Sequence, residues 1–185
     1  MSRLSKSAVG AVAAGASLLA IAAPAQAKSE HVTGGRATVR ASMQISAFLH
    51  SRGITVTPIG SAKLGNGAMT MPMVGGTVNV PTMGGTMKAH GGLEYSKGSK
   101  VVRVSDYILK HQGSSVTLTA DVNGHRIVIA TMSSPNIHMS QTKGTMSGGL
   151  HISAAWAKTI NQLVGLHVVH AGETIGQLSM TIKMG

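Results

Sequence analysis

The 185-residue sequence contains no cysteine, only four aromatic residues and only five acidic residues. Without cysteine there can be no disulfide, no thiolate metal site and no thiol nucleophile. No two acidic residues lie at a spacing that would pair them locally as catalytic carboxylates. Four aromatic side chains also offer little surface for stacking on nucleic-acid bases. These shortages argue against a glycosidase-type hydrolase and against a nucleic-acid partner.

The sequence also lacks the common catalytic motifs. It contains no nucleophile elbow, no zinc-binding helix signature, no phosphate-binding loop and no dinucleotide fingerprint. We therefore expect a binding protein and not an enzyme, and we assign no catalytic residue.

The one long apolar run lies at the N-terminus. Arg3 and Lys6 precede small and apolar residues over 8–23, and small residues at 25 and 27 follow. This order is typical of a secretory signal peptide cleaved after residue 27. The run is too short and too weakly apolar for a transmembrane anchor, which needs about 20 apolar residues. We expect a secreted protein, released or retained at the cell envelope, with no transmembrane anchor.

The chain after this leader is basic. We expect a short N-terminal tail over 28–35 and a single domain over 36–185. These 158 residues keep 14 of the 16 Lys and Arg residues and all nine His, which gives a net charge of about +9. Outside the cell, such a charge suits anionic envelope polymers, although it also serves simply to keep a glycine-rich protein soluble.

Alternating residues and glycine pairs predict a mainly β fold. Asn123-Gly124 lies between two strand-like runs and is typical of a type I′ hairpin, because both residues tolerate a positive φ. About ten short antiparallel strands at this spacing favour a sandwich or a barrel-like sheet. Residues 133–149 show little periodicity and are expected to form a loop or a poorly paired edge. The clearest strand-like runs are 54–57, 77–80, 100–104, 115–119 and 126–130.

Two stretches instead have the helical period. Apolar residues recur at i, i+4, i+7 and i+8 over 41–52 and again over 153–164. Gly53 and Gly165 follow them at the position where a helix commonly ends. The residues after each helix also match, so that 41–73 and 153–184 form a degenerate repeat of helix, strand, glycine-containing loop and second strand.

Methionine is unusually frequent, with Met69, Met71 and Met73 at every second position of one predicted strand. Thioether sulfur is a soft ligand, so the triplet is a candidate Cu(I) site in an exported protein. The alternative is that the period of two places all three on one face that packs into the core.

Among the nine histidines, His90 has a distinctive setting because Gly91 and Gly92 follow it. Two glycines leave the backbone open to a flat ligand, but they also suit a turn. The residues alone leave both interpretations open.

Several short, mostly glycine-centred motifs occur along the chain: Met71-Pro-Met73, Gly75-Gly76-Thr77, Gly84-Gly85-Thr86, His90-Gly91-Gly92-Leu93, Thr117 to Val122, Ala171 to Thr174 and Gly176 to Ile182. Together they resemble the motifs of HtaA-type domains, over about residues 36–184. The resemblance implies a secreted or envelope-held bacterial domain, some members of which bind haem through a tyrosine assisted by a histidine of the glycine-rich strand.

The assisting histidine matches His90, and the tyrosine position falls at or near His50, where this sequence has no tyrosine. The resemblance therefore implies a haem site at His90, with His50 as a second imidazole ligand and Gly91 and Gly92 beside them. Lys88 and Arg52 are candidate partners for the haem propionates. The alternative is an adhesive envelope module that recognises anionic polymers and holds no haem.

Overall fold

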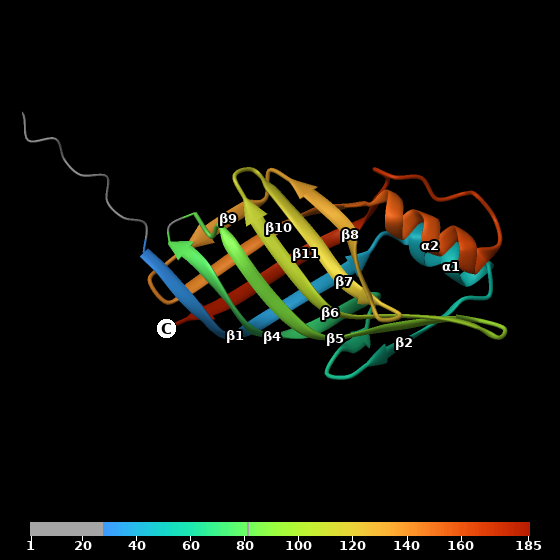
Figure 1. The fold of residues 1–185 in the computed structure, drawn as a ribbon, viewed down its shortest axis with the longest axis horizontal. Coiled ribbons are helices and arrows are strands. Elements are labelled where there is room, and N and C mark those ends of the chain that lie inside the picture. The colour runs from blue at the N-terminus through green and yellow to red at the C-terminus, as the bar shows by residue number, and fades with distance from the viewer. Residues whose placement is uncertain (1–27, 81) are drawn as a thin grey trace, which may run out of the picture.

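The computed structural model describes residues 28–80 and 82–185, so the predicted leader lies outside the described residues. These described residues are mainly β, as predicted, with eleven strands and two short helices (Figure 1). In chain order the elements are β1 (Lys28–Ala41), α1 (Met43–Ser51), β2 (Thr55–Ile59), β3 (Lys63–Gly65), β4 (Ala68–Val80), β5 (Gly85–Lys97), β6 (Lys100–Gln112), β7 (Ser115–Val122), β8 (His125–Ser133), β9 (Asn136–Met139), β10 (Lys143–Ile152), α2 (Ala154–Val164) and β11 (Thr174–Met184).

Eight of the strands close into a barrel. The hydrogen-bonded order runs β5-β6-β7-β8-β10-β11-β1-β4, and β4 pairs back with β5. The strands that pair are antiparallel, and the short strands β2, β3 and β9 extend the wall at β5, β4 and β10. Closure removes the open edges that a flat sheet of this size would expose.

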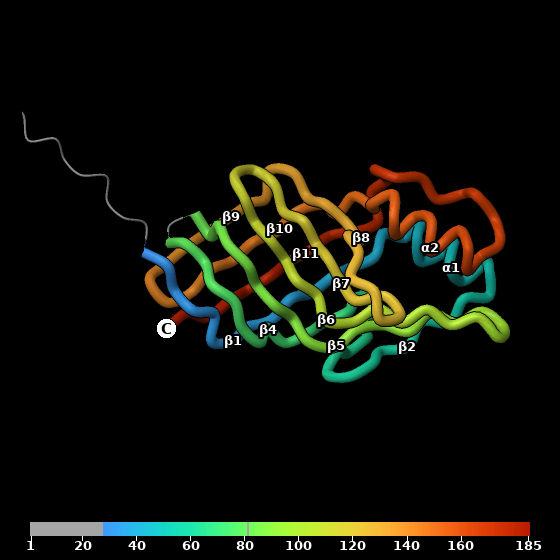
Figure 2. Tube along the Cα trace, in the orientation of Figure 1, coloured from blue at the N-terminus to red at the C-terminus, as the bar shows by residue number. Residues whose placement is uncertain are grey.

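Both helices lie at one end of the barrel, and the C-terminus lies at the other (Figures 1 and 2). Each begins at a serine that caps it: the Ser42 Oγ accepts from the Ile45 N–H at 3.2 Å, and the Ser153 Oγ accepts from the Trp156 N–H at 3.0 Å. Gly165 ends α2 with a φ of 80°. Among the described residues, no helix is long and apolar enough to cross a membrane.

Methionine fills much of the barrel interior. Six of the largest fully buried side chains are Met71, Met83, Met87, Met132, Met146 and Met180. The predicted copper triplet lies on the inward face of β4, where Met69, Met71 and Met73 are 5%, 2% and 3% exposed. This placement agrees with the core-packing interpretation, because unbranched thioether side chains fill irregular space well.

The Asn123-Gly124 hairpin joins β7 to β8 as predicted, and both residues have a positive φ, 52° and 87°. Residues 28–35, by contrast, are not a tail. They form the first half of β1, where Glu30 pairs with Val78 and His31 with Thr77 of β4.

The prediction of a loop or poorly paired edge over 133–149 is also wrong for the second half of this range. These residues begin β10, which is an integral barrel strand between β8 and β11. Two of its inward positions are glycines, Gly144 and Gly148, so the apolar alternation was hidden. The Sδ atoms of Met139 and Met132 lie only 2.7 Å from where a Cβ at these glycines would be, so methionine takes the space of the missing side chains.

The predicted repeat is incomplete in space. Strands β4 and β11 flank β1 on either side, but no strand corresponding to β2 follows α2. There the Asn161 side chain accepts from the N–H groups of Val168 and Val169 and donates to the Val169 carbonyl. This buried amide satisfies backbone groups that strand pairing would otherwise satisfy.

Candidate functional site

A cavity of about 430 Å³ lies at the helical end of the barrel. Its walls come from α1, α2, β2 and the adjoining ends of the barrel strands, and its lining is mostly apolar. All four aromatic residues of the chain line it: Phe48, Tyr95, Tyr107 and Trp156. Its volume and lining are those of a small-molecule site.

Helix α1 covers this cavity loosely. None of its residues is fully buried, whereas α2 buries six. The apolar face of α1 carries Ile45, Phe48 and Leu49, which are half-buried and line the cavity. The amphipathic face predicted from the sequence therefore covers a cavity and not a packed core.

Two tyrosines stand in the opposite wall. Tyr107, on β6, is 4% exposed, and Tyr95, on β5, meets Trp156 edge to face. Burial raises the pKa of Tyr95 to about 12, and it raises the pKa of Tyr107 well above its usual value, with the nearby Tyr95 adding to the effect. Both phenols therefore stay protonated at physiological pH. A protonated phenol can donate a hydrogen bond, but it must lose its proton before it can ligate a metal as phenolate.

Polar groups are sparse and lie at the rim. His50, in the last turn of α1, is exposed and lines the cavity. Arg52 follows the helix with its guanidinium 5.7 Å from the centre of the Phe48 ring. The rim thus offers an imidazole and a cation next to an aromatic wall, which suits an apolar ligand that carries a metal and acidic groups.

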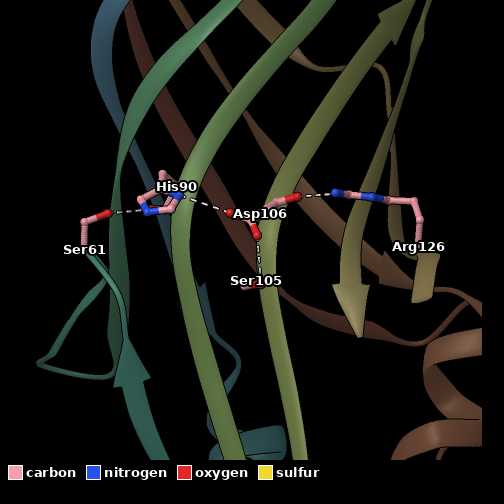
Figure 3. Close-up of polar contacts among 5 residues, drawn as sticks. All are labelled: Ser61, His90, Ser105, Asp106 and Arg126. Carbon is pink, nitrogen blue, oxygen red and sulfur yellow. Dashed lines mark hydrogen bonds and ion pairs between the residues drawn. The ribbon is translucent and has the colours of Figure 1, made fainter. Parts of the chain in front are cut away.

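His90 is elsewhere. Its side chain is 58% exposed and its Nδ1 lies 3.0 Å from the Asp106 Oδ1 (Figure 3). The Ser61 Oγ donates to the His90 carbonyl, the Ser105 Oγ donates to Asp106, and Arg126 donates to the Asp106 carbonyl. His90 does not line the cavity that His50 lines, so the structure does not bring the two predicted imidazoles to one pocket.

The open backbone predicted beside His90 is occupied by the chain itself. A Cβ at Gly92 would lie 1.8 Å from the Val104 carbonyl oxygen of β6, and one at Gly91 would lie 2.4 Å from the Ala62 nitrogen. His90 and Gly91 lie where the β5–β6 register shifts. These glycines allow neighbouring backbone to approach at a bulge, and they do not open a surface to a flat ligand.

Lys88 is also remote from the cavity. It lies beside a separate polar depression formed by the ends of β4 and β5. Of the predicted propionate partners, only Arg52 therefore lies beside the aromatic cavity. In the described part of the chain, no group of three His, Asp or Glu side chains is arranged to hold a metal ion.

No signal in the sequence predicts the aromatic lining, because the four aromatic residues stand out there only by their scarcity. Phe48 lies on α1, Tyr95 on β5, Tyr107 on β6 and Trp156 on α2. Only closure of the barrel and docking of α2 bring these four residues together.

No protein-family model matches this sequence, and no curated protein matches it either. Solved structures do match. The C-terminal domain of HtaA from Corynebacterium glutamicum is 17% identical, with a TM-score of 0.70, over 84% of this chain and 99% of that domain. The N-terminal domain of HtaA from the same organism is 16% identical, with a TM-score of 0.64, over 82% and 97%.

A third structure, the heme binding protein HtaB from Corynebacterium glutamicum, is 14% identical, with a TM-score of 0.61, over 85% of this chain and 96% of that one. All three likenesses span most of both chains. At these identities the shared property is the arrangement of strands and helices. This chain therefore has the HtaA-type fold.

Proposed function

We propose that this protein is a secreted or envelope-held, non-catalytic haem-binding protein whose site is the aromatic cavity beneath α1. The observation that carries the proposal is the gathering of all four aromatic side chains around one apolar cavity. Aromatic and aliphatic walls suit a porphyrin, which is flat and largely apolar. HtaB, a protein of the same fold, is a heme binding protein, which supports this choice of ligand.

His50 is the residue proposed to ligate the iron. It is the histidine that lines the cavity, and neutral imidazole is an ordinary axial ligand of haem iron. The tyrosines are less suitable, because the pKa of Tyr95 is raised to about 12 and phenolate formation is correspondingly unfavourable. Arg52, at the cavity rim, is placed to pair with a propionate. His90 lies outside this site.

Hemin titration of the mature protein tests the proposal. We expect a sharp, saturable Soret band at one equivalent. His50→Ala should shift that band and weaken binding at least tenfold, while His90→Ala, which removes another exposed imidazole, should change neither. A graded, salt-sensitive rise that is equal in both variants would show loose scavenging by surface histidines and would contradict the proposal.

A second candidate function rests on charge. All charged residues are basic in strands β3, β10 and β11 and in the adjoining parts of β1 (34–41) and β4 (68–73). The five residues are Arg36, Arg40, Lys63, Lys143 and Lys183.

An outer barrel face of this charge suits an anionic polymer of the cell envelope. Binding to a polyphosphate-rich polymer that is lost at high salt, and that is reduced in the Lys143→Gln/Lys183→Gln variant, would support this function. Binding that survives in high salt would argue against it. Neither outcome depends on haem.

A further inference from the structure

His111 is the one histidine of the chain that is buried. It lies near the end of β6, on the inward face of the barrel, and is 4% exposed. Neither ring nitrogen has a hydrogen-bond partner among the described residues. A neutral imidazole carries one donor and one acceptor, so this position leaves both desolvated and unpaired. Such a group in a native interior calls for a partner.

The position is remote from the aromatic cavity. The β5–β6 hairpin touches α2, where Lys97 and Lys100 donate to carbonyls in its last turn. Strand β6 then runs away from the helices, so His111 stands toward the opposite end of the barrel. The proposed haem site therefore does not explain it.

The surroundings of His111 are rich in thioether sulfur. Directly opposite on β5 is Gly85, which has no side chain, and Met87 is the diagonal neighbour on the same inward face. On the other side, Val116 of β7 faces His111. Met132 of β8 is next in that row, but its sulfur lies against Gly148 of β10, on the side away from β6.

A second methionine beside His111 comes from the turn between β4 and β5. A Cβ at Gly84 would lie 3.8 Å from the His111 carbonyl oxygen, so this turn lies against the end of β6. Met83 immediately precedes Gly84. Met83 and Met87 are both 0% exposed. Two buried thioethers therefore come from segments that adjoin the unpaired imidazole.

We propose that this end of the barrel is a binding site for Cu(I), with His111 and thioethers from Met83 and Met87 as the ligands. Thioether is a soft donor that selects Cu(I), and imidazole ligates copper readily. None of these ligands carries a negative charge, so a monovalent ion is easier to hold in the apolar interior than Zn²⁺ or Cu²⁺. The site is distinct from the Met69, Met71 and Met73 triplet of β4.

The test uses the purified mature protein with Ag(I) as a redox-inert probe and, under anaerobic conditions, Cu(I) held by a competing chelator. We expect one equivalent to bind and to raise the melting temperature of the wild type. X-ray absorption should show sulfur and nitrogen neighbours around the metal. His111→Leu should weaken binding at least tenfold and abolish the metal-induced rise.

The His111→Leu variant has a second readout that keeps the test decisive. It replaces an unpaired polar ring by an apolar side chain, so without metal it should melt at or above the wild-type temperature. The double variant Met83→Leu/Met87→Leu should also lose the metal, because it removes both thioethers. It should still fold, because Met to Leu is nearly volume-conserving. Met180→Leu, a buried methionine of β11, is the matched control and should bind as the wild type does.

Equal Ag(I) and Cu(I) binding by wild type and His111→Leu would overturn the proposal. So would the absence of any stoichiometric binding by a wild type that folds normally, which would leave an internal water as the partner of His111. Failure of the haem proposal would appear in the hemin titration of the His50→Ala variant and not in these metal-binding measurements.

Discussion

The ring of Tyr95 meets the ring of Trp156 edge to face, with centroids 5.6 Å apart and planes inclined by 64°. Tyr95 belongs to β5 and Trp156 to α2, so the pair joins the barrel wall to the packed helix. Both rings line the aromatic cavity. The contact therefore joins two walls of the cavity, whereas α1 covers the cavity more loosely.

Trp156→Ala is expected to destabilise the fold by about 3–5 kcal/mol, because Trp156 is 5% exposed and its removal leaves a large void. Tyr95→Phe keeps the ring contact and should change the free energy of unfolding by less than about 1 kcal/mol. Urea denaturation followed by circular dichroism measures both. Equal losses in the two variants would show that the phenol, and not the ring contact, is what stabilises this junction.

The tyrosines should also make stability fall at high pH. Burial raises the folded-state pKa of Tyr95 to about 12 from an ordinary value of 10. The neutral phenol is favoured in the folded protein, so this stabilisation is complete below pH 10 and is lost as pH rises toward 12, at about 1.4 kcal/mol per pKa unit.

Spectrophotometric titration of tyrosinate should therefore show no ionisation at pH 10 while the protein stays folded. Tyr95→Phe should lose less stability than the wild type between pH 10 and 12. A midpoint near 10 in the folded protein would contradict the buried placement of both phenols.

Filling the cavity should abolish hemin binding without unfolding the protein. Leu49→Trp places a large ring in the space that α1 covers, and no residue of this helix is tightly packed. Met43→Trp adds the same ring on the same helix, at a side chain that is 89% exposed. Hemin affinity should drop at least tenfold in Leu49→Trp only. Unchanged binding in both would place the ligand elsewhere.

The glycine-rich motif of β5 should prove structural. Gly92→Ala directs a methyl group into the Val104 carbonyl, so we expect a loss of about 2–3 kcal/mol or more. Gly34→Ala, in β1, has no neighbour within 4 Å and should stay within about 0.5 kcal/mol of the wild type. Thermal denaturation compares the two. A folded Gly92→Ala protein with normal stability would show that the strands can move apart there.

Asp106 should matter more for its backbone than for its ion pair. Its φ is 51°, a conformation that Asp and Asn tolerate and Ala resists by about 1–2 kcal/mol. Asp106→Ala should therefore be destabilising and Asp106→Asn close to neutral in thermal melts. His90→Ala, which removes only an exposed ion pair, should cost less than about 1 kcal/mol. A His90→Ala loss as large as that of Asp106→Ala would favour the ion pair instead.

Local features of the fold were predictable from the sequence because their causes are local. The helical period and the glycines at 53 and 165 placed both helices to within two residues. Asn123-Gly124 predicted a hairpin because both residues accept a positive φ. Strand β10 could not be predicted because two of its inward positions are glycines, which break the apolar alternation. Methionines of neighbouring strands fill the space beside those glycines.

The candidate site was predictable only in part. His50 and Arg52 follow from the resemblance; His50 lines the cavity, and Arg52 lies over the ring of Phe48, which also lines it. His90 and its glycines stand out equally in the sequence, yet they belong to a bulge on the outside of the barrel. Nothing in the local sequence distinguishes a glycine that admits a ligand from one that admits a neighbouring strand.

A cysteine-free, basic, mainly β chain with two helices, each followed by a glycine, could be predicted from the sequence, because composition, period and turn chemistry act over a few residues. Tertiary structure alone decided where the four aromatic side chains meet and which histidines face a cavity, the solvent or the core. Barrel closure joins β4 to β5 and carries residues that are distant in sequence to one end, and no short-range signal encodes that meeting.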